Sequence, residues 1–119
     1  MHEDELRTLL DDLERDGYLS TARFVDAMVR RRGERYGVRR VAWELDQRGV
    51  DAADQAAALQ ALRETEPERA WQAWERRFGR APTDALDRAR QHRFLLARGF
   101  GAEAIAKVFR RLREPLDPA

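Results

Sequence analysis

The chain has 119 residues, of which 38% are charged and none is cysteine, so a disulfide framework and thiol chemistry are excluded. No run of about 18 apolar residues marks a membrane span and no apolar leader follows Met1, so we expect a cytoplasmic protein without membrane contact. The net charge is only +1, yet residues 1–20 carry −5, residues 21–50 carry +4, residues 51–68 carry −4 and residues 69–119 carry +6. Charge segregated in this way produces local potentials that the net charge conceals.

Apolar residues at helical spacing predict four helices before residue 65. The first carries leucines on one face and is expected to end at Gly17, and Ser20 is placed to cap the second. The third is expected to end at Gly49, because glycine adopts a left-handed conformation at little cost, and Asp51 can cap the fourth. The apolar faces comprise Leu6, Leu9, Leu10 and Leu13, then Phe24, Val25 and Met28, then Val38, Val41, Ala42 and Leu45, then Leu59 and Leu62.

Three more helices are predicted in the second half of the chain. Thr65 and Glu68 form a capping-box pattern in which Pro67 falls in the first turn, where it is tolerated. Thr83 can cap the next helix, and Pro115 is expected to end the last one. The aromatic residues of the first of these helices are expected in the core rather than on a contact surface, and they are Trp71, Trp74 and Phe78. The last helix has a clean apolar stripe of Ile105, Val108, Phe109 and Leu112.

The sequence repeats itself at a spacing of fifty residues. Arg48-Gly49-Val50 returns as Arg98-Gly99-Phe100, and Leu45 is matched by Leu95. A repeat of this length indicates small helical units that bury their apolar faces on each other and present a long surface to a partner. The predicted fold is therefore all-α, with about seven helices that form tandem three-helix repeats in an elongated array.

The helix count predicts an incomplete set of repeats. Residues 1–19 would form the last helix of a truncated first repeat, residues 20–64 and 65–114 would each form a three-helix repeat, and residues 115–119 would be a tail. The leucine face of the first helix needs cover, because a lone short helix is marginal in water. It could dock on the next repeat, pair with another chain, or lack partners that a longer parent protein supplies. A monomer is expected otherwise.

Catalytic and metal sites are not indicated. His92 lies in a charged helical stretch with no cysteine available, so a zinc site is not expected. Ser20 is the only serine and occupies a predicted capping position, which argues against a serine nucleophile. The glycines lie at predicted helix ends rather than in a phosphate-binding loop. The sequence therefore predicts a protein that is not an enzyme and uses no metal or cofactor.

Arginines cluster around the turn after the second predicted helix, and a smaller cluster follows at the comparable end of a later helix. Their guanidinium groups could grip phosphates, and Tyr36 among them could stack on a base or pack locally. They could equally meet acidic side chains of a protein filament, or pair with local carboxylates such as Glu34 and Glu44 on a solvated face. The candidate binding residues are Arg30, Arg31, Arg32, Arg35, Tyr36, Arg39 and Arg40, followed by Arg76, Arg77 and Arg80.

Trp43 falls roughly opposite the apolar stripe of its helix. It either seals the junction between repeats or is an exposed anchor at a partner interface. Arg48 and Arg98 precede the repeated glycines Gly49 and Gly99, and we interpret all four as structural residues of the helix ends. There the arginines favour the negative end of the helix dipole and can satisfy the last carbonyl groups.

Several short motifs follow one another in a definite order. They are Gly17-Tyr18-Leu19-Ser20 through Arg23-Phe24, then Tyr36-Gly37 and Glu44-Leu45 through Arg48-Gly49-Val50, and then Arg93-Phe94-Leu95 followed by Arg98-Gly99-Phe100. In this combined order, over roughly residues 5–112, the chain resembles the RecX family of bacterial recombination regulators.

The resemblance implies tandem three-helix repeats, normally three, that lodge in the helical groove of the RecA–DNA filament. It also implies inhibition or modulation of RecA ATP hydrolysis, strand exchange and coprotease activity, and hence roles in DNA repair, homologous recombination and the SOS response. The expected partners are the RecA nucleoprotein filament and single- or double-stranded DNA. Two alternatives stay open, a DNA-binding helical module without sequence specificity and a scaffold that binds protein without DNA contact. Sequence-specific recognition is disfavoured, because the chain contains no asparagine and its glutamines are scattered.

Overall fold

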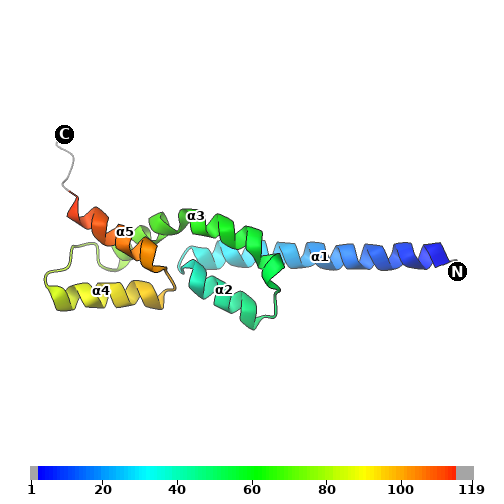
Figure 1. The fold of residues 1–119 in the computed structure, drawn as a ribbon, viewed down its shortest axis with the longest axis horizontal. Coiled ribbons are helices and arrows are strands. Elements are labelled where there is room, and N and C mark those ends of the chain that lie inside the picture. Colours follow the sequence, from blue (N-terminus) through cyan, green and yellow to red (C-terminus); the bar gives the residue numbers. More distant parts are fainter. Residues whose placement is uncertain (1–2, 115–119) are drawn as a thin grey trace.

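The computed structural model describes residues 3–114, which form five α-helices and no strand (Figure 1). In chain order the helices are α1 (Glu3–Gly33), α2 (Val38–Gln47), α3 (Ala52–Arg77), α4 (Ala85–Ala97) and α5 (Ala102–Arg113). The predicted all-α class is confirmed, and the molecule is elongated, with extents of 74 × 33 × 19 Å. The predicted tail, residues 115–119, lies outside the described residues.

Residues 3–114 contain five helices rather than the predicted seven, because two expected breaks do not occur. Gly17 and Ser20, predicted as a helix end and a cap, lie inside α1. The hydroxyl of Thr21 donates to the carbonyl oxygen of Gly17 at 3.1 Å, one turn back along the same helix. A glycine in a helix interior costs only about 1 kcal/mol, which does not break a helix whose later turns are held by packing.

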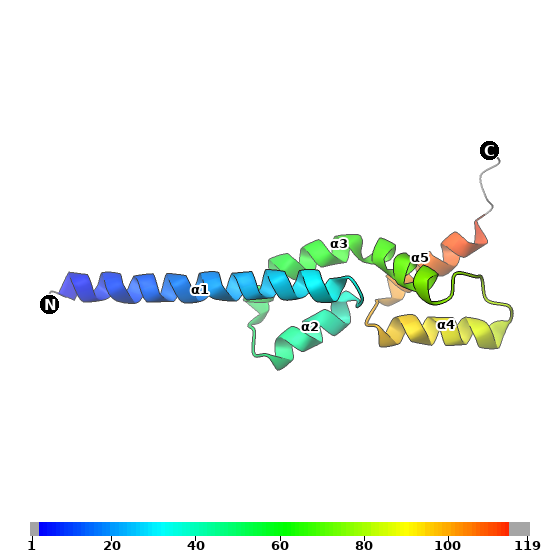
Figure 2. The same ribbon diagram turned by 180° about the vertical axis from the view of Figure 1, so that it is seen from behind.

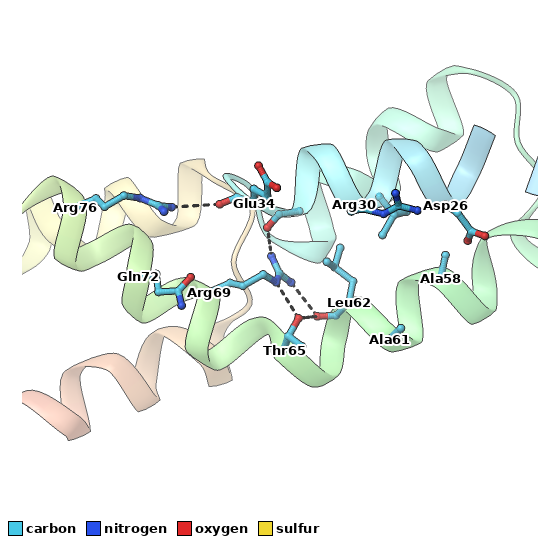
Figure 3. Close-up of a pocket in the computed structure, with 12 residues that line it drawn as sticks. Asp26, Arg30, Glu34, Ala58, Ala61, Leu62, Thr65, Arg69, Gln72 and Arg76 are labelled. Carbon is cyan, nitrogen blue, oxygen red and sulfur yellow. Dashed lines mark hydrogen bonds between the residues drawn. The ribbon is translucent and has the colours of Figure 1, made fainter. Parts of the chain in front are cut away.

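The second missing break lies in α3, where Thr65 was expected to cap a new helix. The Thr65 hydroxyl instead donates to the carbonyl oxygen of Leu62 at 3.1 Å, and Nη2 of Arg69 donates to the same oxygen at 2.8 Å (Figure 3). Pro67 lies inside α3 and has no amide hydrogen, and its ring crowds the preceding turn. The helix therefore curves rather than ends, as Figures 1 and 2 show.

The N-terminus of α4 is also capped by a different residue from the one predicted. Asp84 rather than Thr83 is the N-cap, and its Oδ1 accepts the amide hydrogen of Asp87 at 2.7 Å. A carboxylate at this place interacts favourably with the positive end of the helix dipole as well as accepting the hydrogen bond. Asp51 does occupy the N-cap of α3, although its side chain makes no capping hydrogen bond.

Two hydrophobic cores lie one after the other along the molecule. The first is formed by α1, α2 and the beginning of α3, and consists of Val25, Met28, Val29, Val38, Val41, Leu45, Leu59 and Leu62. The second is formed by the end of α3 with α4 and α5, and consists of Ala70, Ala73, Trp74, Leu95, Phe100, Ala104, Ile105, Val108 and Phe109. Trp71 and Phe78 pack against the second core, so the predicted core role of the three aromatic residues of this helix is confirmed. Helix α3 contributes side chains to both cores.

The first half of α1 projects away from the other helices (Figures 1 and 2). Its leucines are 46–60% exposed, and they are Leu6, Leu9, Leu10 and Leu13. Because α1 continues straight through Gly17, this face does not turn back towards α2 or α3. Local docking, the first of the three expected fates of the leucine face, does not occur in residues 3–114.

The two cores are joined by a close approach of two chain segments. The amide of Gly37, before α2, donates to the carbonyl oxygen of Arg98 at 2.8 Å. The amide of Arg39 donates to the carbonyl oxygen of Gly99 at 3.2 Å. A Cβ atom on Gly37 would lie 2.5 Å from the amide nitrogen of Phe100 and would overlap the Gly99 carbonyl group. Only glycine therefore fits at position 37.

Glu66 on α3 links two helix starts at this junction. Its Oε1 accepts the amide hydrogen of Val38 at 2.6 Å, and its Oε2 accepts that of Gly101 at 3.3 Å. Val38 begins α2 and Gly101 is the N-cap of α5, so one carboxylate lies at the positive ends of two helix dipoles. This arrangement fixes how α2 and α5 are oriented around α3.

Arg69, one turn after Glu66, makes the other set of polar contacts at the junction. Its Nη1 donates to the carbonyl oxygens of Gly33 at 2.7 Å and Tyr36 at 2.8 Å, at the end of α1 and in the following turn. Its side chain is only 13% exposed. Burial lowers the pKa of Arg69, and the neighbouring carboxylate of Glu66 opposes this shift. The guanidinium is thus a structural part of the junction.

Candidate functional site

Tyr36 lies at the centre of the larger arginine cluster, in the turn between α1 and α2. The guanidinium carbons of Arg32, Arg40 and Arg98 lie 4.3, 5.4 and 5.2 Å from the centre of its half-buried ring. Arginines on α1, on α2 and at the end of α4 therefore converge on one aromatic ring. Cations at these distances are attracted by the ring electrons.

A groove of about 490 Å³ lies beside Tyr36, at the junction of the two cores. We name it the junction groove, and its lining residues are Glu34, Arg35, Ala73, Arg76, Arg77, Phe94 and Arg98. Arg35 comes from the first predicted cluster and Arg76 and Arg77 from the second, so the two clusters meet here instead of lying one repeat apart. The guanidinium groups of Arg77 and Arg98 lie 5.7 and 5.1 Å from the ring centre of Phe94.

The junction groove keeps an excess of positive charge, because four arginines line it together with a single carboxylate, that of Glu34. None of the ion pairs within residues 3–114 involves its four arginines. Arg76 donates to the backbone carbonyl oxygen of Glu34 at 3.2 Å, a contact that orients the side chain and leaves its charge available (Figure 3). The groove is therefore suited to a ligand that carries negative charge.

Arg32 and Arg40, by contrast, have a local partner. Nε and Nη2 of Arg32 donate to the two carboxylate oxygens of Glu44 at 2.9 and 2.5 Å, and Nε of Arg40 donates to Glu44 at 3.2 Å. The hydrogen bond with Glu44 raises the pKa of Arg32, and the hydrogen bond with Arg32 lowers the pKa of Glu44. Pairing with the local carboxylate of Glu44, one of the alternatives that the sequence leaves open, thus applies to Arg32 and Arg40. It does not apply to the arginines of the junction groove.

Arg80 also has a local partner and does not line the junction groove. Its Nη1 lies 3.0 Å from Oδ2 of Asp87, and Nη2 of Arg90 lies 3.0 Å from Oδ1 of the same carboxylate. The amide of Thr83 donates to Asp87 as well, at 3.1 Å. These contacts, the Thr83 amide above all and then Arg90, lower the pKa of Asp87 to about 2.

The Asp87→Asn variant should be less stable than the parent in neutral solution, and this difference should vanish in acid. A carboxylate whose pKa is lowered by folding stabilises the protein above its unfolded pKa of about 3.9. That contribution is lost as the pH falls through the folded value of about 2. Urea midpoints measured between neutral pH and the acid limit of folding test this. Glu103→Gln, at a highly exposed carboxylate, should show no such dependence, and an equal Asp87→Asn deficit at every pH would contradict the assignment.

The remaining arginines of the first cluster lie on other surfaces. Arg30 lines a groove of about 570 Å³ between α1 and α3, whose floor includes Leu62 and Ala61 (Figure 3). Arg31 lines a cleft of about 460 Å³ between α1 and α2. Arg39 is exposed on α2. The structure thus divides the predicted cluster among several surfaces.

Trp43 is 56% exposed on α2 and lines the same cleft as Arg31. The guanidinium carbon of Arg40 lies 5.7 Å from its ring centre. Trp43 is not among the residues that line the junction groove, where the two cores meet. Trp43 instead presents an aromatic face to solvent.

The two residues before the repeated glycines differ in what their side chains do. Arg48 and Arg98 are the C-caps of α2 and α4, and their backbone amides bond to the last turns. Gly49 and Gly99 have φ values of 76° and 91°, in the left-handed region that glycine tolerates. The Arg48 side chain lies over an aromatic ring of α1, whereas that of Arg98 lines the junction groove. Arg98 therefore belongs to the candidate surface as well as to a helix end.

Glu66 and Arg69 are the important residues that sequence reasoning did not identify. Their contacts join positions 28–36 residues apart, and no local pattern reports such a pairing.

In the part of the chain that the structure describes, no cluster of acidic, histidine or cysteine side chains could hold a metal ion. None of the helices there is both long and apolar enough to cross a membrane.

Comparison with known proteins identifies both halves of the chain. Residues 22–59 match the model of the second three-helix domain of RecX, and residues 64–109 match that of the third. No solved structure gives a significant match.

Several similar proteins share the same name, Regulatory protein RecX. The Leptothrix cholodnii protein is 49% identical over 106 residues, which cover 89% of this chain and 68% of the relative. The Ralstonia nicotianae protein is 43% identical over 107 residues, covering 88% and 66%, and the Herminiimonas arsenicoxydans protein is 40% identical over 114 residues, covering 96% and 76%. The chain spans about two thirds of the length of the first of these relatives. With both domain matches and this level of identity, the chain belongs to the RecX family of regulatory proteins.

Proposed function

We propose that this chain is a cytoplasmic regulator that binds the RecA–DNA filament and restrains RecA ATP hydrolysis, strand exchange and coprotease activity. The family assignment supports the choice of RecA as the partner. The observation that supports binding through the junction groove is its set of four arginines, none of which forms an ion pair within residues 3–114. A filament offers both negative phosphates and repeated protein surfaces to such a groove.

The elongated, fixed shape of the molecule also supports binding along a filament. Two cores follow each other along a molecule 74 Å long, and Glu66 and Gly37 hold the second core against the first. A rigid surface loses little conformational freedom when it binds, which favours affinity. We expect a monomer to act along the filament. Its domains are proposed as residues 1–19, 20–64 and 65–114, with α1 and α3 continuous across the two boundaries.

The test uses RecA filaments preassembled on single-stranded DNA. Addition of the protein should lower ATP hydrolysis and the protein should sediment with the filament. A variant with Arg35→Ala, Arg76→Ala and Arg77→Ala should lose most of this effect. Its charge-matched control is Arg63→Ala, Arg110→Ala and Arg113→Ala, three exposed arginines outside the junction groove.

The outcomes separate this proposal from the alternatives. The control variant should inhibit RecA like the parent, with unchanged helicity in both. If the protein sediments with naked DNA but leaves ATP hydrolysis untouched at every salt concentration, it is a DNA-binding helical module and the RecA proposal is refuted. A scaffold that binds protein without DNA would associate with neither DNA nor the filament.

A further inference from the structure

A continuous line of contacts leads from the junction groove to Trp43. Arg98 lines the groove and lies 5.2 Å from the ring centre of Tyr36. Arg40 lies 5.4 Å from the same ring and 5.7 Å from the ring of Trp43. The groove and the exposed indole are thus two ends of one surface, in which arginines and aromatic rings alternate and Arg40 is also paired with Glu44.

The two ends of this surface offer different chemistry. The junction groove holds arginines that make no ion pair within residues 3–114. At the other end, Trp43 is 56% exposed, whereas Trp74 is 3% exposed and Trp71 is half-buried against the second core. Trp43 is therefore the most exposed of the three tryptophans and the one best placed to receive a flat ligand.

Single-stranded nucleic acid carries both complementary groups on one flexible chain. Its phosphates match guanidinium groups, and its unpaired bases stack on aromatic side chains. A duplex keeps its bases stacked inside and would use the arginines alone. An acidic peptide would likewise use the arginines and leave the indole without a function.

We propose that Arg35, Arg76, Arg77 and Arg98, with Tyr36 and Trp43, form a binding track for single-stranded nucleic acid. The backbone phosphates lie in the junction groove, Tyr36 orients Arg98 and Arg40, and a base stacks on Trp43. The inference rests on the proposed function, since it names the component of the filament that this surface contacts. Its test uses naked oligonucleotides, so that the two proposals can fail separately.

The first experiment follows tryptophan fluorescence during titration with a short oligothymidylate, in the absence of RecA. Stacking of a base on Trp43 should quench the exposed indole, and Trp43→Phe should remove most of the quenching, because Trp74 is buried and Trp71 is half-buried against the second core. Trp43→Ala should weaken binding about tenfold, measured by fluorescence anisotropy of a labelled oligonucleotide. Trp43→Phe should retain most of the affinity, since it keeps an aromatic face.

The second experiment measures how binding depends on salt. If the four groove arginines each neutralise a phosphate, the logarithm of the association constant should fall against the logarithm of salt concentration with a slope of about −3. The variant with Arg35→Ala, Arg76→Ala and Arg77→Ala should reduce the slope to about −1. The control with Arg63→Ala, Arg110→Ala and Arg113→Ala should keep the parent slope, and circular dichroism should be the same for all three proteins.

Three results would overturn the track. Binding of the oligonucleotide that is unaffected by the groove variant would place the site elsewhere. Equal binding of a polyglutamate peptide in competition would assign the groove to an acidic protein segment, and preference for a duplex over a single strand would remove the role of Trp43. If the parent protein binds the oligonucleotide as described but does not inhibit RecA, the proposed function is refuted and the binding track still stands.

Discussion

The Arg69→Met variant should unfold with a free energy about 3 kcal/mol lower than the parent, which is one of the two largest effects expected here. The substitution keeps an unbranched apolar stem but removes the donors to the carbonyl oxygens of Gly33, Tyr36 and Leu62 and to the hydroxyl of Thr65. Carbonyl groups left without donors in a partly buried junction cost more than the hydrogen bonds themselves contribute. Urea denaturation followed by circular dichroism measures the difference.

A matched substitution on the same helix serves as the control. Arg63→Met removes an exposed guanidinium whose only hydrogen bond within residues 3–114 is a long one, 3.4 Å, to Gln60. It should change the free energy of unfolding by less than about 0.5 kcal/mol. Arg69→Lys, which keeps the charge but cannot reach the same set of acceptors, should fall between the parent and Arg69→Met. Equal stability of Arg63→Met and Arg69→Met would show that the junction does not depend on this guanidinium.

The Gly37→Ala variant should be destabilised by about 3 kcal/mol, because a methyl group at this position overlaps backbone atoms rather than a movable side chain. Gly37 has a φ of −79°, which any residue can adopt, so the expected loss comes from the contact alone. To relieve it, the two cores would have to move apart and lose the hydrogen bonds from Gly37 to Arg98 and from Arg39 to Gly99. Thermal or urea denaturation measures the loss.

The same substitution at Gly17, glycine to alanine, should raise the stability of the protein rather than lower it. Gly17 lies inside α1 with nothing within 4 Å of a Cβ atom, so alanine there should stabilise the protein by about 0.5–1 kcal/mol through its higher helix propensity. A Gly37→Ala variant as stable as the parent would mean that the second core is not held against the first as described.

The two cores could be predicted from the sequence because their signals are local. The spacing of Val38, Val41 and Leu45 marks one face of a helix, and this face is buried. Phe109 and Ile105 are buried for the same reason. Periodicity reports which residues share a face, and burial of that face is the main source of stability for a short helix.

The helix boundaries at Gly17 and Thr65 could not be predicted in the same way. Glycine and a capping-box pattern favour a break, but each favours it by only about 1 kcal/mol. The packing of later turns and a donor such as Arg69 outweigh a preference of this size. Continuity of α1 and α3 is decided by contacts between distant residues, which a single sequence does not display.

The candidate site was predicted in its residue types and not in its arrangement. The sequence identifies Arg35, Arg76 and Arg77 as cations near helix ends, yet they lie in one groove only because the last turns of α3 lie against the turn that follows α1. Arg98 was assigned to a helix end alone, since nothing in its neighbours indicates that its side chain faces Tyr36. Similarly, the pairing of Glu44 with Arg32 distinguishes the engaged arginines from the available ones only after folding.

Because α3 belongs to both cores, neither repeat is an independent folding unit. Leu59, near the start of this helix, packs in the first core, and Trp74, near its end, packs in the second. Unfolding of one repeat therefore removes part of the packing of the other. In arrays of repeats, stability is the sum of weak intrinsic terms and strong terms between neighbours, and a shared helix makes the neighbour term dominant. The two halves of the junction groove therefore appear and disappear together, and the chain presents either the whole basic surface or none of it.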